Sequence, residues 1–246
     1  MGHGILLSGG ADTDFMIHGV FQYSFFGHPV WITTTHISIL LVMIILIAFA
    51  IAANRVMAKA AEVPEGFQNV IELLVEKLDG MVDSSMGQAA PRYANYIGTI
   101  FIFILLSNIS GLLGLRPPTA DYGVTLPLAL ITFTMIHYSK LKYQKPLTIW
   151  KDLCSPLPPW LPIWLPINVV SAVAVPVSLS LRLFANVLSG TAMMALIYGL
   201  LGWFATAWPA ALHVYFDLFS GAIQTYVFCM LTMTYISNEI GDGTRR

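Results

Sequence analysis

The sequence has little charge and few cysteines. Asp, Glu, Lys and Arg make up 10% of its 246 residues, against about a quarter in a typical soluble domain. The chain therefore lacks the polar residues needed to cover a water-facing surface. Its net charge of −1 gives no electrostatic reason to expect nucleic acid as a partner. The two cysteines, Cys154 and Cys229, lack the spacing of a metal site, so we expect neither a disulfide framework nor a metal.

Motifs of bond-making enzymes are also absent. The sequence contains no glycine-rich phosphate loop, no nucleophile elbow and no His-Glu-x-x-His pair. It shows neither an inverted repeat nor a repeat of about 20 to 50 residues. We therefore expect a protein that is not itself an enzyme and that uses no cofactor.

Long apolar runs are what the sequence does contain, and each is about as long as a helix that crosses the hydrocarbon core. They predict an all-α polytopic membrane protein, with about five transmembrane helices and one amphipathic surface helix in a single membrane domain over residues 1–246. The segments that we predict are an N-terminal tail at 1–30, spans at 31–53, 93–115 and 124–138, the surface helix at 62–86, and two final helices at 167–201 and 209–237. As one helix, 167–201 would be about 50 Å long, against about 30 Å of hydrocarbon, so we expect it to be tilted or bent.

The distribution of Lys and Arg predicts the orientation in the membrane. If the N-terminus is outside, the cytoplasmic segments hold nearly all of the basic residues outside the membrane, while the opposite side holds only Arg116. Cytoplasmic loops are enriched in basic residues, so the N-terminus is expected outside and the C-terminus in the cytoplasm. The cytoplasmic residues are Arg55, Lys59, Lys77, Arg92, Lys140, Lys142, Lys145, Lys151, Arg245 and Arg246.

Arg182 is the only ionised side chain between residues 167 and 201. A guanidinium keeps its proton at any physiological pH, and its burial in hydrocarbon costs at least about 2.5 kcal/mol. We therefore expect Arg182 to have a function, with Ser178 and Asn186 on the same helix face. Two alternatives remain open: a stripe of hydrogen bonds that joins two helices, and an internal ion pair with Asp217.

A second polar stripe runs along the last helix, where His213, Asp217 and Gln224 follow at helical spacing. Asp217 is either the internal partner of Arg182 or a hydrated acid on a proton path. His213 is either an interfacial residue or part of the same path. Asn108 and Asp121 are weaker candidates for lining such a path, and Asp121 also fits a residue that caps or orders a turn.

The segment Pro176-Val-Ser-Leu-Ser-Leu-Arg182-Leu-Phe-Ala-Asn186-Val-Leu-Ser-Gly190 resembles the signature of subunit a of F-type ATP synthases. Other segments agree in the order that the family shows, and the resemblance covers nearly the whole chain after about residue 20. These segments are Pro64-Glu-Gly-Phe-Gln-Asn, Phe103-Ile-Leu-Leu-Ser-Asn-Ile-Ser-Gly-Leu, Pro117-Pro-Thr-Ala-Asp121-Tyr-Gly-Val-Thr125-Leu and Gln224-Thr-Tyr-Val-Phe-Cys-Met-Leu-Thr.

The resemblance implies partners, a membrane and residue roles. It implies a ring of carboxylate-bearing c subunits, b-type subunits of the peripheral stalk, and a bacterial inner membrane or equivalent energy-coupling bilayer. It makes Arg182 the essential arginine, flanked by Asn186 and faced by Gln224, in a tilted hairpin of the last two helices. Asp217 falls where the family usually has a histidine or an acid. At position 191 this chain has threonine, where relatives often carry histidine or glutamate. We therefore expect the proton relay to depend more on Asp217, on water and on the region of Asn108 and Asp121.

The expected function is that of a stator subunit. Two aqueous half-channels and Arg182 would couple proton translocation to rotation of the c-ring, while ATP chemistry takes place on other subunits. The alternatives are a self-contained secondary transporter of an anionic substrate, a purely structural membrane subunit, and an Na⁺-coupled version of the same stator subunit.

Overall fold

The computed structural model describes residues 19–25, 28–60, 64–113, 115–144, 164–201 and 208–240. The helices in these ranges are α1 (Thr34–Met57), α2 (Phe67–Met86), α3 (Ala90–Ile109), α4 (Tyr122–Tyr143), α6 (Trp164–Leu201), α7 (Trp208–His213) and α8 (Gly221–Ile240). Short 3-10 turns lie at Gly87–Ala89, Ser110–Leu113 and Pro118–Ala120, and a π-helical segment at Val214–Ser220 joins α7 to α8.

Five helical stretches among the described residues are long and apolar enough to cross a membrane. They are Thr34–Met57, Phe67–Leu112, Tyr122–Tyr143, Pro166–Ile197 and Ala211–Ile240. The predicted all-α polytopic membrane fold is therefore confirmed.

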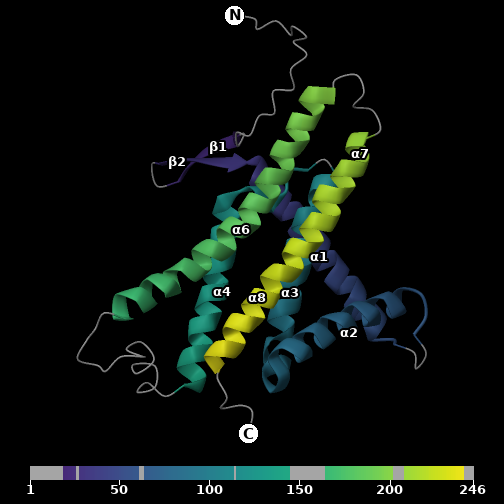
Figure 1. The fold of residues 1–246 in the computed structure, drawn as a ribbon. Helices are drawn as coiled ribbons and strands as arrows, with labels where there is room; N and C mark the ends of the chain where they lie inside the picture. Colours follow the sequence, from purple (N-terminus) through teal and green to yellow (C-terminus); the bar gives the residue numbers. More distant parts are fainter. Residues whose placement is uncertain are drawn as a thin grey trace, which may run out of the picture.

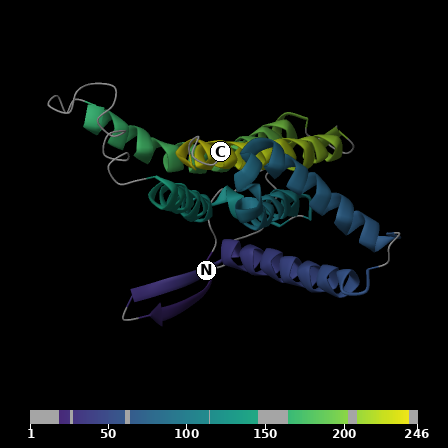
Figure 2. The ribbon, with the colours of Figure 1, turned by 90° about the horizontal axis from the view of Figure 1, so that it is seen from below.

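The helices are arranged in layers (Figures 1 and 2). The long helix α6 and the run α7–α8 form one outer layer, α3 and α4 lie behind it, and α1 lies on the far side of α3 and α4. α6 and α8 run obliquely to the other helices and antiparallel to each other (Figure 1). One face of this helical pair is consequently left without a neighbouring helix among the described elements.

The core lies between α3, α4, α6 and α8. Its fully buried side chains include Ile97 and Ile104 from α3, Leu183 from α6, and Phe228 and Met233 from α8. Hydroxyl groups buried beside this core form hydrogen bonds, as between Tyr93 Oη and Ser139 Oγ at 2.6 Å. Such packing and hydrogen bonding hold helices together where lipid removes much of the hydrophobic driving force.

α2 runs across the end of the bundle at which the C-terminus lies (Figure 1). It buries Ile71 and Val82 on one face, while acidic side chains such as Glu76 are exposed. A glycine lies at each end of α2, and both have a positive backbone φ angle: +57° at Gly66 and +53° at Gly87. A residue with a side chain rarely adopts this left-handed conformation, so both corners depend on glycine.

The structure differs from the predicted tail and from the predicted last helix. β1 (Gly19–Phe25) and β2 (His28–Thr33) form an antiparallel hairpin, so part of the segment that we predicted only as an N-terminal tail is regular structure. These two segments are rich in aromatic and β-branched residues, which favour strands. The helix predicted over 209–237 is interrupted by the π-helical segment. The tail residues 1–18, Lys145, Lys151, Arg245 and Arg246 lie outside the described residues.

Candidate functional site

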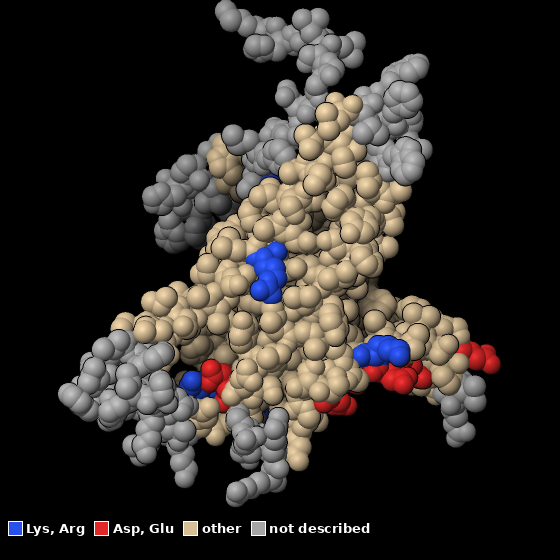
Figure 3. All heavy atoms as spheres, viewed as in Figure 1, with Lys and Arg blue, Asp and Glu red and all other residues tan. Residues whose placement is uncertain are grey.

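Arg182 lies on the face of α6 that points away from the core. Its neighbours Leu179 and Leu183 are fully buried, whereas the arginine side chain is exposed. Arg182 makes no hydrogen bond or ion pair with any residue that the structure describes. In Figure 3, the basic area over α6 stands alone on a broad uncharged face, and most other charged atoms visible there lie toward the lower edge.

The exposed surface of α6 near Arg182 is largely apolar, with Ser178 as a polar exception. Large apolar side chains are exposed along α6, the π-helical segment and α8, as is expected of helices embedded in a membrane. They include Leu181, Leu188, Met193, Leu218, Phe219, Ile223 and Tyr226. We refer to Arg182 together with these residues as the arginine face. A single unpaired cation on such a face fits a partner that brings an anionic group to it.

Asp217 does not pair with Arg182. Its Oδ2 atom lies 3.1 Å from Nδ1 of His213, one turn earlier in the same helical run. The carboxylate also lies against the 3-10 turn after α3, where a Cβ atom on Gly111 would come within 3.2 Å of the Asp217 Cγ and Oδ2 atoms. The internal ion pair between Arg182 and Asp217 was therefore wrong, because the two side chains contact different surroundings.

The π-helical segment explains part of this geometry. It places Asp217 in the middle of a seven-residue stretch, Val214–Ser220, that is wider than an α-helix. The spacing rule behind the second polar stripe assumed an uninterrupted α-helix. In the structure His213 and Asp217 are partly exposed, whereas Gly221 and Gln224 are buried. Isolated π-turns of this kind are frequent at functional sites.

Asn108 links α3 to the start of α8. Its Nδ2 donates to the carbonyl oxygen of Gly221 at 3.1 Å and to Thr225 Oγ1 at 3.4 Å. Its Oδ1 accepts from Thr119 Oγ1 at 2.8 Å. Asn108, Thr119 and Thr225 are all buried, so the network lies inside the protein.

A small cavity brings three of the predicted residues together. Asn108, Asn186 and Asp217 line a space of about 10 Å³ between α3, α6 and the π-helical segment, which is close to the least volume that holds one water. Ser220 Oγ donates to Asn186 Oδ1 at 3.0 Å and so joins the π-helical segment to α6 at this point. The site combines a carboxylate, two amides and room on the scale of one water molecule.

The other predicted residues are distributed around this cavity without lining it. Ser178 is exposed on α6, and the Thr191 hydroxyl donates to the carbonyl oxygen of Leu188 at 2.9 Å. Gln224 is buried, and its Nε2 has no hydrogen-bond partner among the described residues. Asp121 caps α4, with Oδ1 accepting from the Gly123 backbone N–H at 2.8 Å. Within the described ranges, no hydrogen bond joins Gln224 to Arg182.

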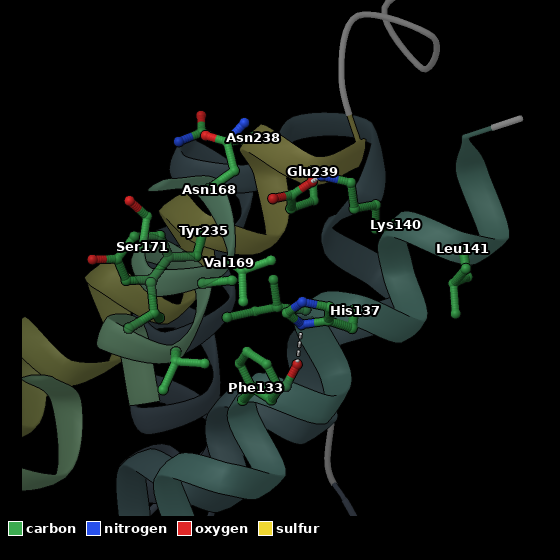
Figure 4. A pocket seen from close by; sticks show the side chains of 14 residues that line it. Phe133, His137, Lys140, Leu141, Asn168, Val169, Ser171, Tyr235, Asn238 and Glu239 are labelled. Carbon is green, nitrogen blue, oxygen red and sulfur yellow. Dashed lines mark hydrogen bonds and ion pairs between the residues drawn. The ribbon is translucent and has the colours of Figure 1, made fainter. Parts of the chain in front are cut away.

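A much larger pocket, of about 670 Å³, lies between the C-terminal ends of α4 and α8 and the N-terminal part of α6 (Figure 4). Its walls are mainly apolar, but polar groups from all three helices reach into it: His137, Lys140, Asn168, Ser171, Asn238 and Glu239. Lys140 Nζ and Glu239 Oε2 form an ion pair at 2.8 Å, and His137 Nδ1 lies 3.0 Å from the Phe133 carbonyl oxygen. We call this space the lower pocket.

The lower pocket was not predicted from the sequence. The sequence does contain two pairs of polar residues that point to it, because His137 and Lys140 are three residues apart, as are Asn168 and Ser171. Each pair therefore lies on one face near a helix end. The convergence of these faces depends on how α4, α6 and α8 cross, which spacing does not show. No group of three or more His, Cys, Asp or Glu that could hold a metal lies within the described parts of the chain.

Comparison with known proteins gives a consistent result. The profile of a family described as "ATP synthase A chain" matches residues 36–237. The chain is 36% identical over 235 residues to "ATP synthase subunit a, sodium ion specific" of Propionigenium modestum, covering 89% of this chain and 77% of the relative. It is 33% identical over 213 residues to "ATP synthase subunit a" of Moorella thermoacetica, covering 86% and 93%. A third relative, "ATP synthase subunit a" of Oceanobacillus iheyensis, is 32% identical, with coverage of 82% and 88%.

Proposed function

Because this chain belongs to the ATP synthase A chain family, we propose that it couples ion translocation across the membrane to rotation of a c-ring. Family membership makes it an integral membrane subunit, without catalytic activity of its own, in the membrane sector of a rotary ATP synthase. The proposal concerns the finer points: how Arg182 acts, where the ion travels, and which way the chain is oriented.

Arg182 acts on a carboxyl group of the ring that moves past it. A protonated carboxyl is neutral and passes through lipid, whereas hydrocarbon strongly disfavours the bare carboxylate. The guanidinium supplies a place in the membrane where the ionised form is favoured. The observation that carries this proposal is that Arg182 is exposed and has no partner among the described residues, on a face that is otherwise uncharged (Figure 3).

Protons enter from the outer side through the region of Asp217. The Asp217–His213 pair and the cavity beside Asn186 offer groups that carry a proton within reach of the hairpin. Water held in such a site transfers protons between side chains that do not touch. Arg182 separates this outer half-path from the inner one, because a fixed cation repels a proton or hydronium.

The lower pocket forms the inner half-path. It is large enough for several waters, and it opens beside the part of α6 that precedes Arg182 in sequence. The ring carboxyl would release its proton into this space after leaving Arg182. Each charge that crosses 100 mV supplies about 2.3 kcal/mol, so several translocated protons together drive ATP formation on the soluble partner.

The lower pocket faces the cytoplasm in this proposal. Described basic residues lie at the end of α1, on α2, at the start of α3 and at the end of α4, which are at this end of the bundle (Figure 1), while Arg116 follows the opposite end of α3. By the positive-inside rule, this distribution supports an N-terminus outside and a C-terminus in the cytoplasm of a bacterial inner membrane or equivalent. The basic residues at the pocket end are Arg55, Lys59, Lys77, Arg92, Lys140 and Lys142. A b-type peripheral stalk would hold the chain against the rotating ring.

Sodium is the second candidate for the coupling ion, because the relative from Propionigenium modestum is named as sodium ion specific. A carboxylate and amide oxygens are ligands that a hard cation prefers. ATP-driven transport in membranes that contain the whole complex distinguishes the ions. A proton-coupled enzyme acidifies vesicles in sodium-free buffer, whereas a sodium-coupled one requires added Na⁺.

The experiment that tests the proposal replaces Arg182 by alanine in the complete complex. Arg182→Ala should abolish ATP-driven ion transport while the complex still assembles, because no fixed cation then favours the ionised ring carboxyl. Lys59→Ala is the matched control, since it removes an exposed cation at the end of α1 and should transport normally. Normal coupled transport by Arg182→Ala would end this proposal.

A further inference from the structure

Asn108 is hydrogen-bonded to two other parts of the protein. Both of its donor contacts go to the first turn of α8, at Gly221 and Thr225, and its side-chain oxygen accepts from Thr119. Asn108 is only 3% exposed. The two acceptors on α8 are themselves 2.8 Å apart, so the amide nitrogen is tied to a single point at the start of that helix.

The contact point of Asn108 is the junction between the π-helical segment and α8. Gly221 follows Ser220 directly and is the first residue of α8. A Cβ atom on Gly221 would lie 2.8 Å from the Asn108 Cβ, so glycine is needed for this approach. The Gly221 carbonyl oxygen also accepts from Thr225 Oγ1 at 2.8 Å. Two side-chain donors therefore fix this carbonyl, one from each helix.

The residue four positions before that junction is Asp217, and its carboxylate rests against Gly111 in the turn that follows α3. Asn108 lies in the last turn of α3 and Gly111 in the 3-10 turn that follows, so this end of α3 meets the start of α8 through Asn108 and the π-helical segment through Gly111. A π-turn contains one residue more than the α-helical turn it replaces, and it persists only if its surroundings hold it. The buried bonds of Asn108 supply such a hold.

We propose that Asn108 is a positioning residue, which keeps the π-helical segment in register and thereby holds Asp217 beside His213 and Gly111. This inference rests on the proposed function in one respect, since Asp217 is taken to carry protons. It differs from the expectation that Asn108 itself lines the path. If Asn108 acts through Asp217, weakening its partners should have the same effect as removing its own side chain.

The test compares Asn108→Ala with Thr225→Val, a nearly isosteric change that removes only the hydroxyl partner. Asn95→Ala is the control, because Asn95 is an exposed asparagine on the same helix. The first readout is ATP-driven ion transport per assembled complex in membranes. The second is the spectrum of a nitroxide label at Leu218→Cys, in the π-helical segment, in a chain whose Cys154 and Cys229 are replaced by alanine. A label at Leu196→Cys, exposed on α6, serves as the remote reference.

Asn108→Ala and Thr225→Val should each lower transport several-fold and change the mobility of the label at position 218, while the label at 196 is unaffected. The double variant should be little worse than either single variant, since groups in one network are not additive. Asn95→Ala should change neither readout. If the complex does not assemble with Asn108→Ala, transport and label mobility are measured in Thr225→Val alone.

Two outcomes would overturn the inference. Unchanged transport and an unchanged label spectrum in Asn108→Ala would show that the amide holds nothing in place. Lost transport in Asn108→Ala with normal transport and label mobility in Thr225→Val would make Asn108 a path-lining group in its own right. The label spectrum needs no transport, so it tests the positioning role even if Arg182→Ala transports normally and the proposed function fails.

Discussion

At the scale of single residues, the structure separates the two charges that the sequence suggested as a pair. Arg182 is exposed on the arginine face, whereas Asp217 turns toward α3 and pairs with His213. An unpaired cation that remains in a membrane helix is costly, so its partner is expected outside the chain. Asp217 can then serve on the path that delivers protons, without neutralising the arginine.

Sequence reasoning found Arg182 from the cost of its charge, which requires no knowledge of the fold. It also found Asn186 and Asp217, because both are polar residues in apolar helices. It could not show that Asn108 is bonded to Gly221 and Thr225, which are more than 110 positions away. That contact depends on how α3 and α8 cross and on the absence of a Cβ atom at Gly221.

Two glycines give a prediction at this scale. A methyl group at Gly111 would lie 3.2 Å from the Asp217 carboxylate and from Pro117, whereas one at Gly98 would lie 3.9 Å from Leu78, an ordinary contact. Gly111→Ala should therefore displace Asp217 and lower ATP-driven transport several-fold, and Gly98→Ala should leave transport near the wild-type rate. The measurement is the initial transport rate per assembled complex. Equal rates in the two variants would contradict the assigned position of Asp217.

At the scale of elements, periodicity and length predicted the apolar helices but not the interruptions in them. The π-helical segment is mainly apolar, as are the helices on both sides of it. Its extra residue therefore could not be recognised from the hydrophobic pattern. The β1–β2 hairpin was missed because aromatic residues in a short segment also suit a membrane interface. We expected the helix at 167–201 to be tilted or bent, because it is longer than the hydrocarbon core is thick. In the structure α6 is a long oblique helix with Pro176 inside it.

The lower pocket gives a prediction for the element α6. Val169 lines this pocket, whereas its neighbour Val170 is 68% exposed and does not. Val169→Trp should fill the space and reduce ATP-driven transport several-fold, because the inner half-path would be obstructed. Val170→Trp adds the same bulk on the same helix turn and should transport normally. If tryptophan at 169 is as harmless as at 170, the lower pocket is not the inner half-path.

At the scale of the whole molecule, the layers explain why one face is left apolar. α3 and α4 cover the inner side of the α6–α8 layer, and α1 covers α3 and α4 from behind (Figure 2). The arginine face on the outer side has no cover from the described elements. The partner that we propose for that face is a ring of subunits with one membrane carboxylate each. The resemblance predicted such a ring from the sequence, and the arrangement in layers supports the proposal that it lies against the arginine face.

The most direct measurement is a structure of the intact membrane sector that resolves the Arg182 side chain and its neighbours. The account predicts that, in at least one rotational state, the guanidinium lies within about 4 to 6 Å of a ring carboxylate, the range over which a charge favours the ionised form. The ring should cover the arginine face in every state. A guanidinium that faces lipid tails in all states, with the ring packed elsewhere, would contradict it.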